Sequence, residues 1–495
     1  MTISSFDPPK DSLRKRATMG VVKTGLSQGV RLLIQVGSVV LLSRLLMPSE
    51  FGLLAMVGPI VGFAALFQDL GLTQAIVQKA RITQAEISAL FWVSVGMGFA
   101  VAALLCAISP VVSWFYGDAR AGVLTAALGI NVIVGGAGSL HFALLNRRMQ
   151  FGALAIIDVS AGLGGLVLSG LVALLYHTYW ALYAGSVAST LIPCVGYWIA
   201  SKWRPSLPRR GSGVGAALHF GANVTGFNVA NFFSRNLDNV LIGRVWGGRP
   251  LGLYDRAYKL MLLPLQQING PISKVMLPVL SQLSGDPARY SQTFIRVQSQ
   301  MLLITIPGIA FMVGTADLLV PILLGRQWAE ASPIFVALGM ASFVQALNNS
   351  IGWLFVSQHR TKEYMYWGLF NSVVCVGSFL IGLPYGPVGV AAGYAIGEFL
   401  RTPGSWWLVT RRGPLKARAV IGMALPHYAG GLASFAAIAG ARTIQSSRPF
   451  LVLGLSLLAS FLASIVTLAA FPRGRLTLRQ TLEQILMTFA HVLGR

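Results

Sequence analysis

Charged side chains are scarce in this sequence, and acidic ones are the scarcest. Only 11% of the 495 residues are charged, with 15 acidic residues against 38 lysines and arginines. Soluble domains usually carry about 25% charged residues. Mean hydropathy is +0.67. This composition excludes an ordinary soluble protein and indicates a chain that crosses a membrane many times.

Cysteine and histidine are also rare, and neither is arranged for catalysis or metal binding. Cys106, Cys194 and Cys375 lie in apolar runs without metal-ligand spacing, so we expect buried apolar thiols. The six histidines are scattered, without the spacing of a zinc site. No G-x-x-x-x-G-K-[ST] sequence occurs. We therefore expect no metal, no cofactor and no catalytic constellation, and the function class that remains is transport or lipid translocation.

Apolar runs long enough to cross a bilayer fill most of the chain. A span needs about 20 mostly apolar residues, and fourteen runs qualify, which predicts an all-α polytopic membrane protein. The expected spans are residues 24–46, 52–70, 87–109, 122–145, 152–175, 179–200, 215–243, 251–280, 297–316, 331–356, 364–383, 387–409, 419–440 and 449–471. The first, seventh and eighth are the most polar.

The distribution of basic residues supports this arrangement. With the N-terminus in the cytoplasm, the expected cytoplasmic segments hold 25 lysines and arginines, and the outer loops hold six. This is the positive-inside pattern, so we expect a multi-pass protein of the bacterial inner membrane with both termini in the cytoplasm. The net charge of +23 then reflects topology and not nucleic-acid binding. The polar, basic N-terminus shows no cleavable signal peptide.

An internal repeat predicts two similar halves. LLSRLLMPSEFGLL (41–54) matches LIGRVWGGRPLGLY (241–254) at an offset of 200, and WALYAG (180–185) matches VGVAAG (388–393) more loosely. Six spans separate the copies, so both halves insert with the same orientation. The pattern therefore predicts two parallel, pseudo-symmetric lobes related by an axis along the membrane normal.

The spans and the repeat together predict the domain organisation. The expected regions are a basic cytoplasmic N-terminus (1–23), an N-lobe of six spans (24–200), a basic cytoplasmic linker (201–214), a C-lobe of six spans (215–410), two further spans (411–471) and a cytoplasmic tail (472–495). In the tail, one helical face carries Leu478, Leu482, Ile485, Phe489 and Val492. This face predicts either an interfacial amphipathic helix or a short helix packed on the protein.

Two polar stripes run along expected spans. The first consists of Ser27, Arg31, Gln35 and Ser38, and the second, in the seventh span, of Asn228, Asn231, Arg235 and Asp238. Steps of three and four residues place each set on one helical face, and a shift of 200 overlays the two. An arginine at the centre of a transmembrane helix costs roughly 2.5–3.5 kcal/mol. We therefore expect Arg31 and Arg235 to face away from lipid and to line a central cavity shared by the two lobes.

The excess of intramembrane cations over acids favours an anionic substrate, and arginine suits phosphate because its planar fork donates two hydrogen bonds. The candidate substrate-binding residues are Arg31, Gln35, Asn231, Arg235 and Lys259, and the candidates for ion coupling are Asp158 and Asp238. The alternative is that the charges neutralise one another within a helix. The pairs that could do so are Asp255 with Lys259, Arg235 with Asp238 and Glu398 with Arg401.

Three segments resemble a known family. LSRLLMPSEFGLLAM, FQDLGLTQAIVQ and LGLYDRAYKLMLLPLQQINGPISKVMLPVLSQL are similar to the WzxC-like polysaccharide flippases of the multidrug/oligosaccharidyl-lipid/polysaccharide exporter superfamily, whose fold is of the MATE/MurJ type. The resemblance covers essentially the whole chain. It implies translocation of undecaprenyl-diphosphate-linked oligosaccharide from the inner to the outer leaflet for exopolysaccharide or lipopolysaccharide biosynthesis. The implied partners are the lipid-linked oligosaccharide, membrane lipids and a polysaccharide polymerase/co-polymerase machinery.

Other functions stay open at this point. A cation-coupled multidrug exporter of the same fold would need an acid-rich cavity, which the cation excess opposes. A lipid II flippase is a closer alternative. A membrane polysaccharide polymerase is disfavoured by the short loops and the lack of a catalytic cluster, and a non-transporting scaffold would leave the intramembrane arginines as an unexplained cost.

Overall fold

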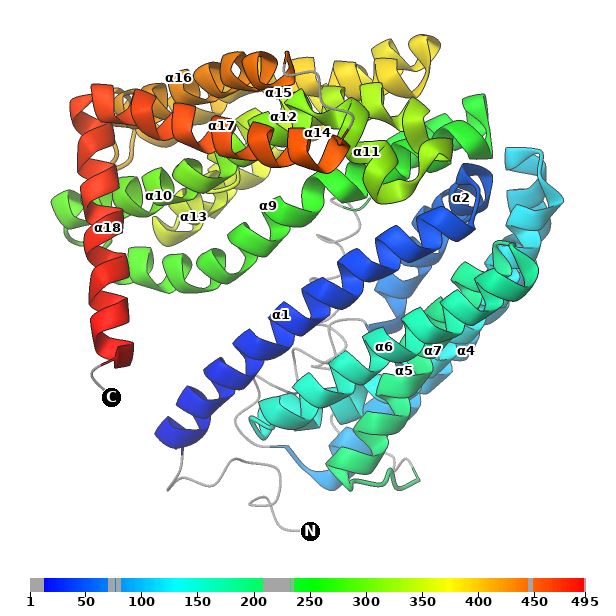
Figure 1. Cartoon of the computed structure of the whole chain (residues 1–495). Helices are drawn as coiled ribbons and strands as arrows, with labels where there is room; N and C mark the ends of the chain where they lie inside the picture. Colours follow the sequence, from blue (N-terminus) through cyan, green and yellow to red (C-terminus); the bar gives the residue numbers. More distant parts are fainter. Residues whose placement is uncertain are drawn as a thin grey trace. The chain divides into compact units, whose positions relative to one another are not determined.

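The computed structural model describes residues 13–69, 76, 82–207, 232, 236–443 and 448–493 (Figure 1). Every regular element within these ranges is a helix, which confirms the all-α prediction. The chain divides into two compact units, Met1–Gly252 and Leu253–Arg495.

The first unit is built from six long helices. They are α1 (Leu13–Leu45), α2 (Pro48–Asp69), α4 (Gln84–Tyr116), α5 (Ala119–Arg147), α6 (Phe151–Tyr176) and α7 (Trp180–Ser201). Residues 236–246 are also helical, and α9 (Gly248–Gln282) begins at the end of this unit.

The second unit continues from α9 with the remaining helices. They are α10 (Pro287–Gly314), α11 (Ala316–Leu324), η3 (Arg326–Ala331), α12 (Ser332–Asn348), α13 (Ile351–Ser357), α14 (Thr361–Gly382), η4 (Leu383–Tyr385), α15 (Gly386–Thr410), α16 (Ala417–Arg442), α17 (Pro449–Ala470) and α18 (Pro472–Leu493).

Among the described residues, eleven segments are long and apolar enough to cross a membrane. One of them, Thr361–Thr410, contains both α14 and α15, so the segments correspond to twelve of the fourteen expected spans. The seventh expected span lies mostly outside the described residues. The eighth corresponds to α9, a helix of 35 residues whose charged and amide side chains lower its hydropathy. Twelve of the expected spans are thus reproduced, whereas α9 is helical over the eighth but is not among the segments apolar enough to count as a candidate span.

The two units repeat one packing pattern. In the first, α4 packs on α5, α5 on α7 and α6 on α7, and in the second α10 packs on α12, α12 on α15 and α14 on α15. The looser sequence repeat marks equivalent close contacts. A Cβ on Gly185 of α7 would lie 2.7 Å from Ser169 Cβ on α6, and a Cβ on Gly393 of α15 would lie 2.5 Å from the Ser378 carbonyl oxygen on α14. Small residues allow membrane helices to approach this closely.

The stronger sequence repeat meets itself where α2 and α9 begin. Gly52 packs against the backbone of Gly248, and Gly252 packs against the backbone of Pro48. A Cβ at either glycine would overlap the facing carbonyl oxygen. Positions 48 and 52 correspond to 248 and 252 under the offset of 200, so the two contacts are exchanged by the repeat. Each copy of the repeat therefore makes the same close approach to the other.

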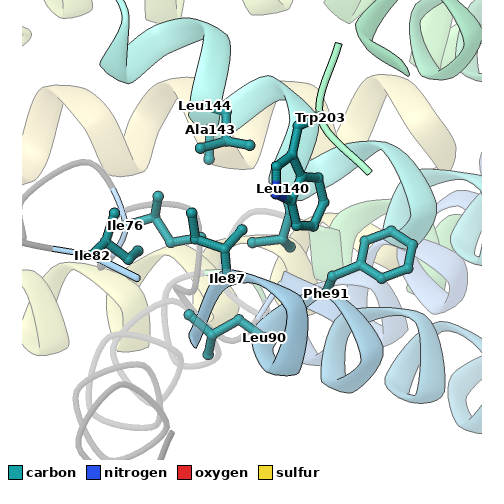
Figure 2. Packing of buried hydrophobic residues seen from close by; sticks show 9 residues of the cluster. All are labelled: Ile76, Ile82, Ile87, Leu90, Phe91, Leu140, Ala143, Leu144 and Trp203. Atoms are coloured by element: carbon teal, nitrogen blue, oxygen red, sulfur yellow. The ribbon is translucent and has the colours of Figure 1, made fainter. Parts of the chain in front are cut away.

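A buried apolar cluster closes one end of the first unit (Figure 2). Its members come from the start of α4, the end of α5, the residues before α4 and the residues after α7: Ile76, Ile82, Ile87, Leu90, Phe91, Leu140, Ala143, Leu144 and Trp203. Trp203 Nε1 donates a hydrogen bond to Gln84 Oε1 (2.6 Å), and Gln84 Nε2 donates one to the Arg204 carbonyl (3.0 Å). The chain that leaves α7 is therefore fastened to the start of α4.

The expectation of buried thiols is wrong for one cysteine. Cys106 is exposed on α4 and Cys194 is partly exposed, whereas Cys375 is buried. An apolar run in a membrane helix can face either a neighbouring helix or lipid, so hydrophobicity alone does not fix burial in the protein.

Candidate functional site

A cavity of about 680 Å³ opens in the first unit between α1, α6 and α7. From α1 it is lined by Arg31, Gln35 and Ser38, which are the last three members of the first polar stripe. The stripe therefore shares one face, as its spacing predicts, and this face lines a cavity within its own unit; the predicted central cavity shared with the second stripe stays a prediction. Ser27, the remaining member, does not line it.

Arg31 forms an ion pair inside this cavity. Its Nη1 lies 2.9 Å from Asp158 Oδ2 on α6, and the two side chains keep 48% and 34% of their surface exposed. The hydroxyl of Tyr197 on α7 donates a longer hydrogen bond of 3.4 Å to Asp158 Oδ1. A partly exposed pair of this kind contributes only about 1 kcal/mol. Arg31 is thus neutralised within the membrane helices while its guanidinium remains accessible to a ligand.

Small residues on α6 allow α1 to come close enough for this pairing. A Cβ on Gly162 would lie 3.3 Å from Ile34 Cγ2, and one on Gly170 would lie 3.4 Å from Leu41 Cδ2. Gly162 is four residues from Asp158, so it lies one turn along the same face. The close packing of α1 on α6 brings two charges together that are 127 residues apart in the sequence.

The opposite wall of the cavity, on α7, was missed by sequence reasoning. Ser186, Ser189, Pro193 and Tyr197 line it, and they recur at steps of three, four and four residues, as the charged stripes do. Ser186 also accepts a hydrogen bond of 2.7 Å from Asn131 Nδ2 on α5. The periodicity could have identified this face. Serine and tyrosine are common in membrane helices, however, so without a neighbouring charge they do not indicate a cavity wall.

The other candidate residues lie elsewhere. Lys259 on α9 forms an ion pair of 2.8 Å with Asp255, four residues earlier, as the spacing predicts. Asp238 is buried, and its Oδ1 accepts a hydrogen bond from the backbone N–H of Asn239 (2.9 Å). Asn231 and Arg235 lie outside the described residues, and with them the predicted pair between Arg235 and Asp238.

A second intramembrane arginine shows how a purely structural pair differs from Arg31. Arg401 and Glu398 on α15 are paired, and each side chain is only 10% exposed. Glu398 Oε1 also accepts a hydrogen bond from Gln345 Nε2 (3.2 Å), and Arg401 Nη1 donates one to the Asn371 carbonyl (3.1 Å). The Arg401 guanidinium lies over the Tyr394 ring at 5.7 Å. These groups are fully engaged with the protein, which confirms the predicted pair, whereas Arg31 retains an accessible face.

The described residues contain no group of three or more His, Cys, Asp or Glu side chains that could hold a metal ion. What the cavity offers is one guanidinium, one carboxylate, and amide and hydroxyl groups between apolar walls. Such a set can bind a phosphate and hydrogen-bond to sugar hydroxyls.

Comparison with known proteins places the chain in a family. Residues 41–333 match a family described as "polysaccharide biosynthesis protein". The chain is 22% identical over 422 residues to the lipopolysaccharide biosynthesis protein WzxC of Escherichia coli (strain K12), covering 84% of this chain and 86% of that protein. It is 24% identical over 345 residues to the succinoglycan biosynthesis transport protein ExoT of Rhizobium meliloti (strain 1021), covering 70% of each chain.

A solved structure shares the fold. The lipid II flippase MurJ, in an inward closed conformation, superposes with a TM-score of 0.74 at 13% identity, covering 93% of this chain and all of the other. This likeness shows that the helical architecture is of the MurJ type. Because the family match extends over more than half of the chain, the protein belongs to the polysaccharide biosynthesis protein family of multi-pass membrane proteins.

Proposed function

We propose that the protein is a flippase that moves a polyprenyl-diphosphate-linked oligosaccharide, such as an undecaprenyl-diphosphate repeat unit, from the inner to the outer leaflet of the bacterial plasma membrane. The accessible guanidinium of Arg31 in a polar cavity within membrane helices carries this proposal. The family and the names of the relatives, which refer to biosynthesis and transport of surface polysaccharides, support it. The inner-membrane location, the cytoplasmic termini and cooperation with polymerase/co-polymerase machinery belong to the same proposal.

The chemistry of the cavity matches the parts of this substrate. A diphosphate carries charged oxygens that a guanidinium binds through two parallel hydrogen bonds. Sugar hydroxyls can donate to and accept from Gln35 and the serines that line the wall. The apolar lipid chain needs no polar partner and can remain in the bilayer. Asn231, Arg235 and Lys259 are proposed to contribute further contacts from the second stripe and from α9.

Asp158 and the diphosphate would compete for the same guanidinium. Once the substrate binds Arg31, the freed carboxylate lies next to a second anion, and the repulsion between the two favours pairing of the carboxylate with a cation. We therefore propose that Asp158 couples substrate binding to uptake of a positive charge, and that its renewed pairing with Arg31 assists release. Asp238 is the second candidate for this role.

The test is the sidedness of lipid-linked oligosaccharide in cells that lack the protein. A membrane-impermeant label for sugars would report the outer leaflet, with complementation by the wild-type chain, by R31Q and by R289Q. Arg289 is a matched control because it is an exposed arginine paired with Asp286 near the start of α10. We expect R31Q, but not R289Q, to leave repeat units accumulated and inaccessible at normal protein levels. Normal labelling in the deletion strain, with only polymer missing, would refute the flippase function and favour polymerisation.

A further inference from the structure

A second cavity, of about 490 Å³, lies in the second unit between α10, α16 and α18. Its lining includes the arginines Arg296 and Arg473 and the amides Gln292 and Gln480. No acidic side chain is among its lining residues in the part of the chain that the structure describes. The cavity therefore presents hydrogen-bond donors and positive charge without an internal counter-ion.

The position of the cavity is fixed by three membrane helices. Its lining residues lie between residues 291 and 299 in the N-terminal half of α10, at Met423 near the start of α16, and at the start of α18, which follows the end of the spanning helix α17. Helix α18 packs on α10, α16 and α17 (Figure 1). The cavity thus opens at the membrane–water boundary at this end of the unit, where lipid headgroups lie.

The way α18 is attached supports a membrane-surface role for this helix. It contacts α10 through polar side chains: Thr477 Oγ1 lies 2.7 Å from Ser299 Oγ, and Gln300 Nε2 donates a hydrogen bond to Gln484 Oε1. The described members of the apolar stripe of α18 lie outside this contact face, since Leu478 is only half-buried and Leu482 is 58% exposed. A helix that packs through polar groups and leaves apolar side chains such as Leu482 exposed has the character of an interfacial helix.

Buried, hydrogen-bonded side chains form the floor of the cavity. His427 Nδ1 lies 2.9 Å from the Met423 carbonyl, which holds its proton there, so Nε2 accepts from Ser299 Oγ (3.3 Å). Ser299, Thr477 and His427 are all buried. The Arg473 guanidinium lies against Gly422 of α16, in the space that a side chain there would fill. The packing against α16 therefore restricts the orientation of the Arg473 side chain.

We propose that this cavity binds the phosphate headgroup of an anionic phospholipid from the adjacent leaflet, held by Arg296, Arg473 and the amides of Gln292 and Gln480, while α18 lies in the interface beside it. Guanidinium groups suit a phosphodiester because of their charge and paired donors. The lipid chains would remain in the bilayer, next to exposed apolar side chains of α18 such as Leu482. The site is distinct from the Arg31 cavity and does not depend on what the protein transports.

The experiment measures lipid retained by the purified full-length protein in native mass spectrometry, after exchange into detergent micelles with phosphatidylglycerol or phosphatidylcholine. The test variant is R296Q/R473Q. The control is R289Q/R479Q, which makes the same charge change on the same two helices at residues paired outside the cavity with Asp286 and Glu483. We expect retained phosphatidylglycerol to fall roughly tenfold in the test variant, to remain in the control, and to exceed phosphatidylcholine in the wild type.

Three outcomes would overturn the proposal. Equal retention of the two lipids by the wild type would show no headgroup recognition, and an equal loss in the control variant would indicate general surface charge. Displacement of the lipid by millimolar inorganic phosphate, with phosphate protecting the protein against heat as well as the lipid does, would assign the cavity to a free anion. The variant R296K/R473K retains the charge, so recovery of binding by it separates a failure of recognition from a failure to fold.

Discussion

The pairing of Arg31 with Asp158 makes a prediction in which two neutral substitutions act in opposite directions. If Asp158 competes with a diphosphate for Arg31, R31Q removes the ligand's partner and D158N removes the ligand's competitor. A charge-assisted hydrogen bond contributes about 1.5–3 kcal/mol, from which about 1 kcal/mol is lost in breaking the partly exposed pair. R31Q should therefore weaken diphosphate binding by about 0.5–2 kcal/mol, or roughly 2- to 30-fold. D158N should strengthen it roughly fivefold.

The assay is isothermal titration calorimetry, in which a short-chain prenyl diphosphate is titrated into the purified protein. Arg120→Gln serves as a control, since Arg120 is half-exposed and pairs with Asp118 away from the cavity. The reasoning would be refuted if R31Q and D158N shifted the affinity in the same direction, or if neither changed it more than twofold. A double-mutant cycle on thermal stability gives an independent check, with an expected coupling of about 1 kcal/mol between the two side chains.

Further predictions concern the helix contacts and the buried charges. Gly382→Ala should destabilise the protein by about 1–3 kcal/mol, because its Cβ would overlap the Gly389 carbonyl; Gly377→Ala on the same helix, with nothing within 4 Å, should be neutral in detergent melting experiments. Glu398→Gln should cost about 3–5 kcal/mol in the same experiment, because it leaves a buried arginine uncompensated; a loss below 1 kcal/mol would contradict the structural role. A hydrogen bond from the neighbouring arginine side chain lowers the pKa of Asp118 in the folded protein. The ionised Asp118 carboxylate therefore stabilises the fold above the unfolded carboxyl pKa of about 3.9, and this stabilisation is lost as the pH falls through the lower folded pKa. Asp118→Asn should accordingly make acid-induced destabilisation shallower.

The sequence predicts much of the architecture because membrane insertion leaves strong one-dimensional signals. Long apolar runs, loop charges and the two repeats predict the helices and the doubled plan, and helical spacing predicts that Arg31, Gln35 and Ser38 share a face. Local ion pairs such as Lys259 with Asp255 are also predictable, because their partners lie one turn apart.

Contacts between helices could not be predicted in the same way. The partner of Arg31 is 127 residues away, and its approach depends on how closely α1 packs against glycines of α6. The α7 wall of the cavity carries no charge, so periodicity alone did not distinguish it from a packing face. The exposure of Cys106 was missed because an apolar sequence does not reveal whether its neighbour is protein or lipid.

The reciprocal contact of Gly52 with Gly248 and of Gly252 with Pro48 has a consequence for how the two halves of the chain can change over time. The backbone of each copy of the repeat packs directly against the glycine of the other copy. A side chain added at either glycine collides with the backbone of the opposite copy, so neither half can drift at these positions without a matching change in its twin. The contact therefore offers a physical reason why glycine stands at both positions while most of the surrounding repeat has lost its identity.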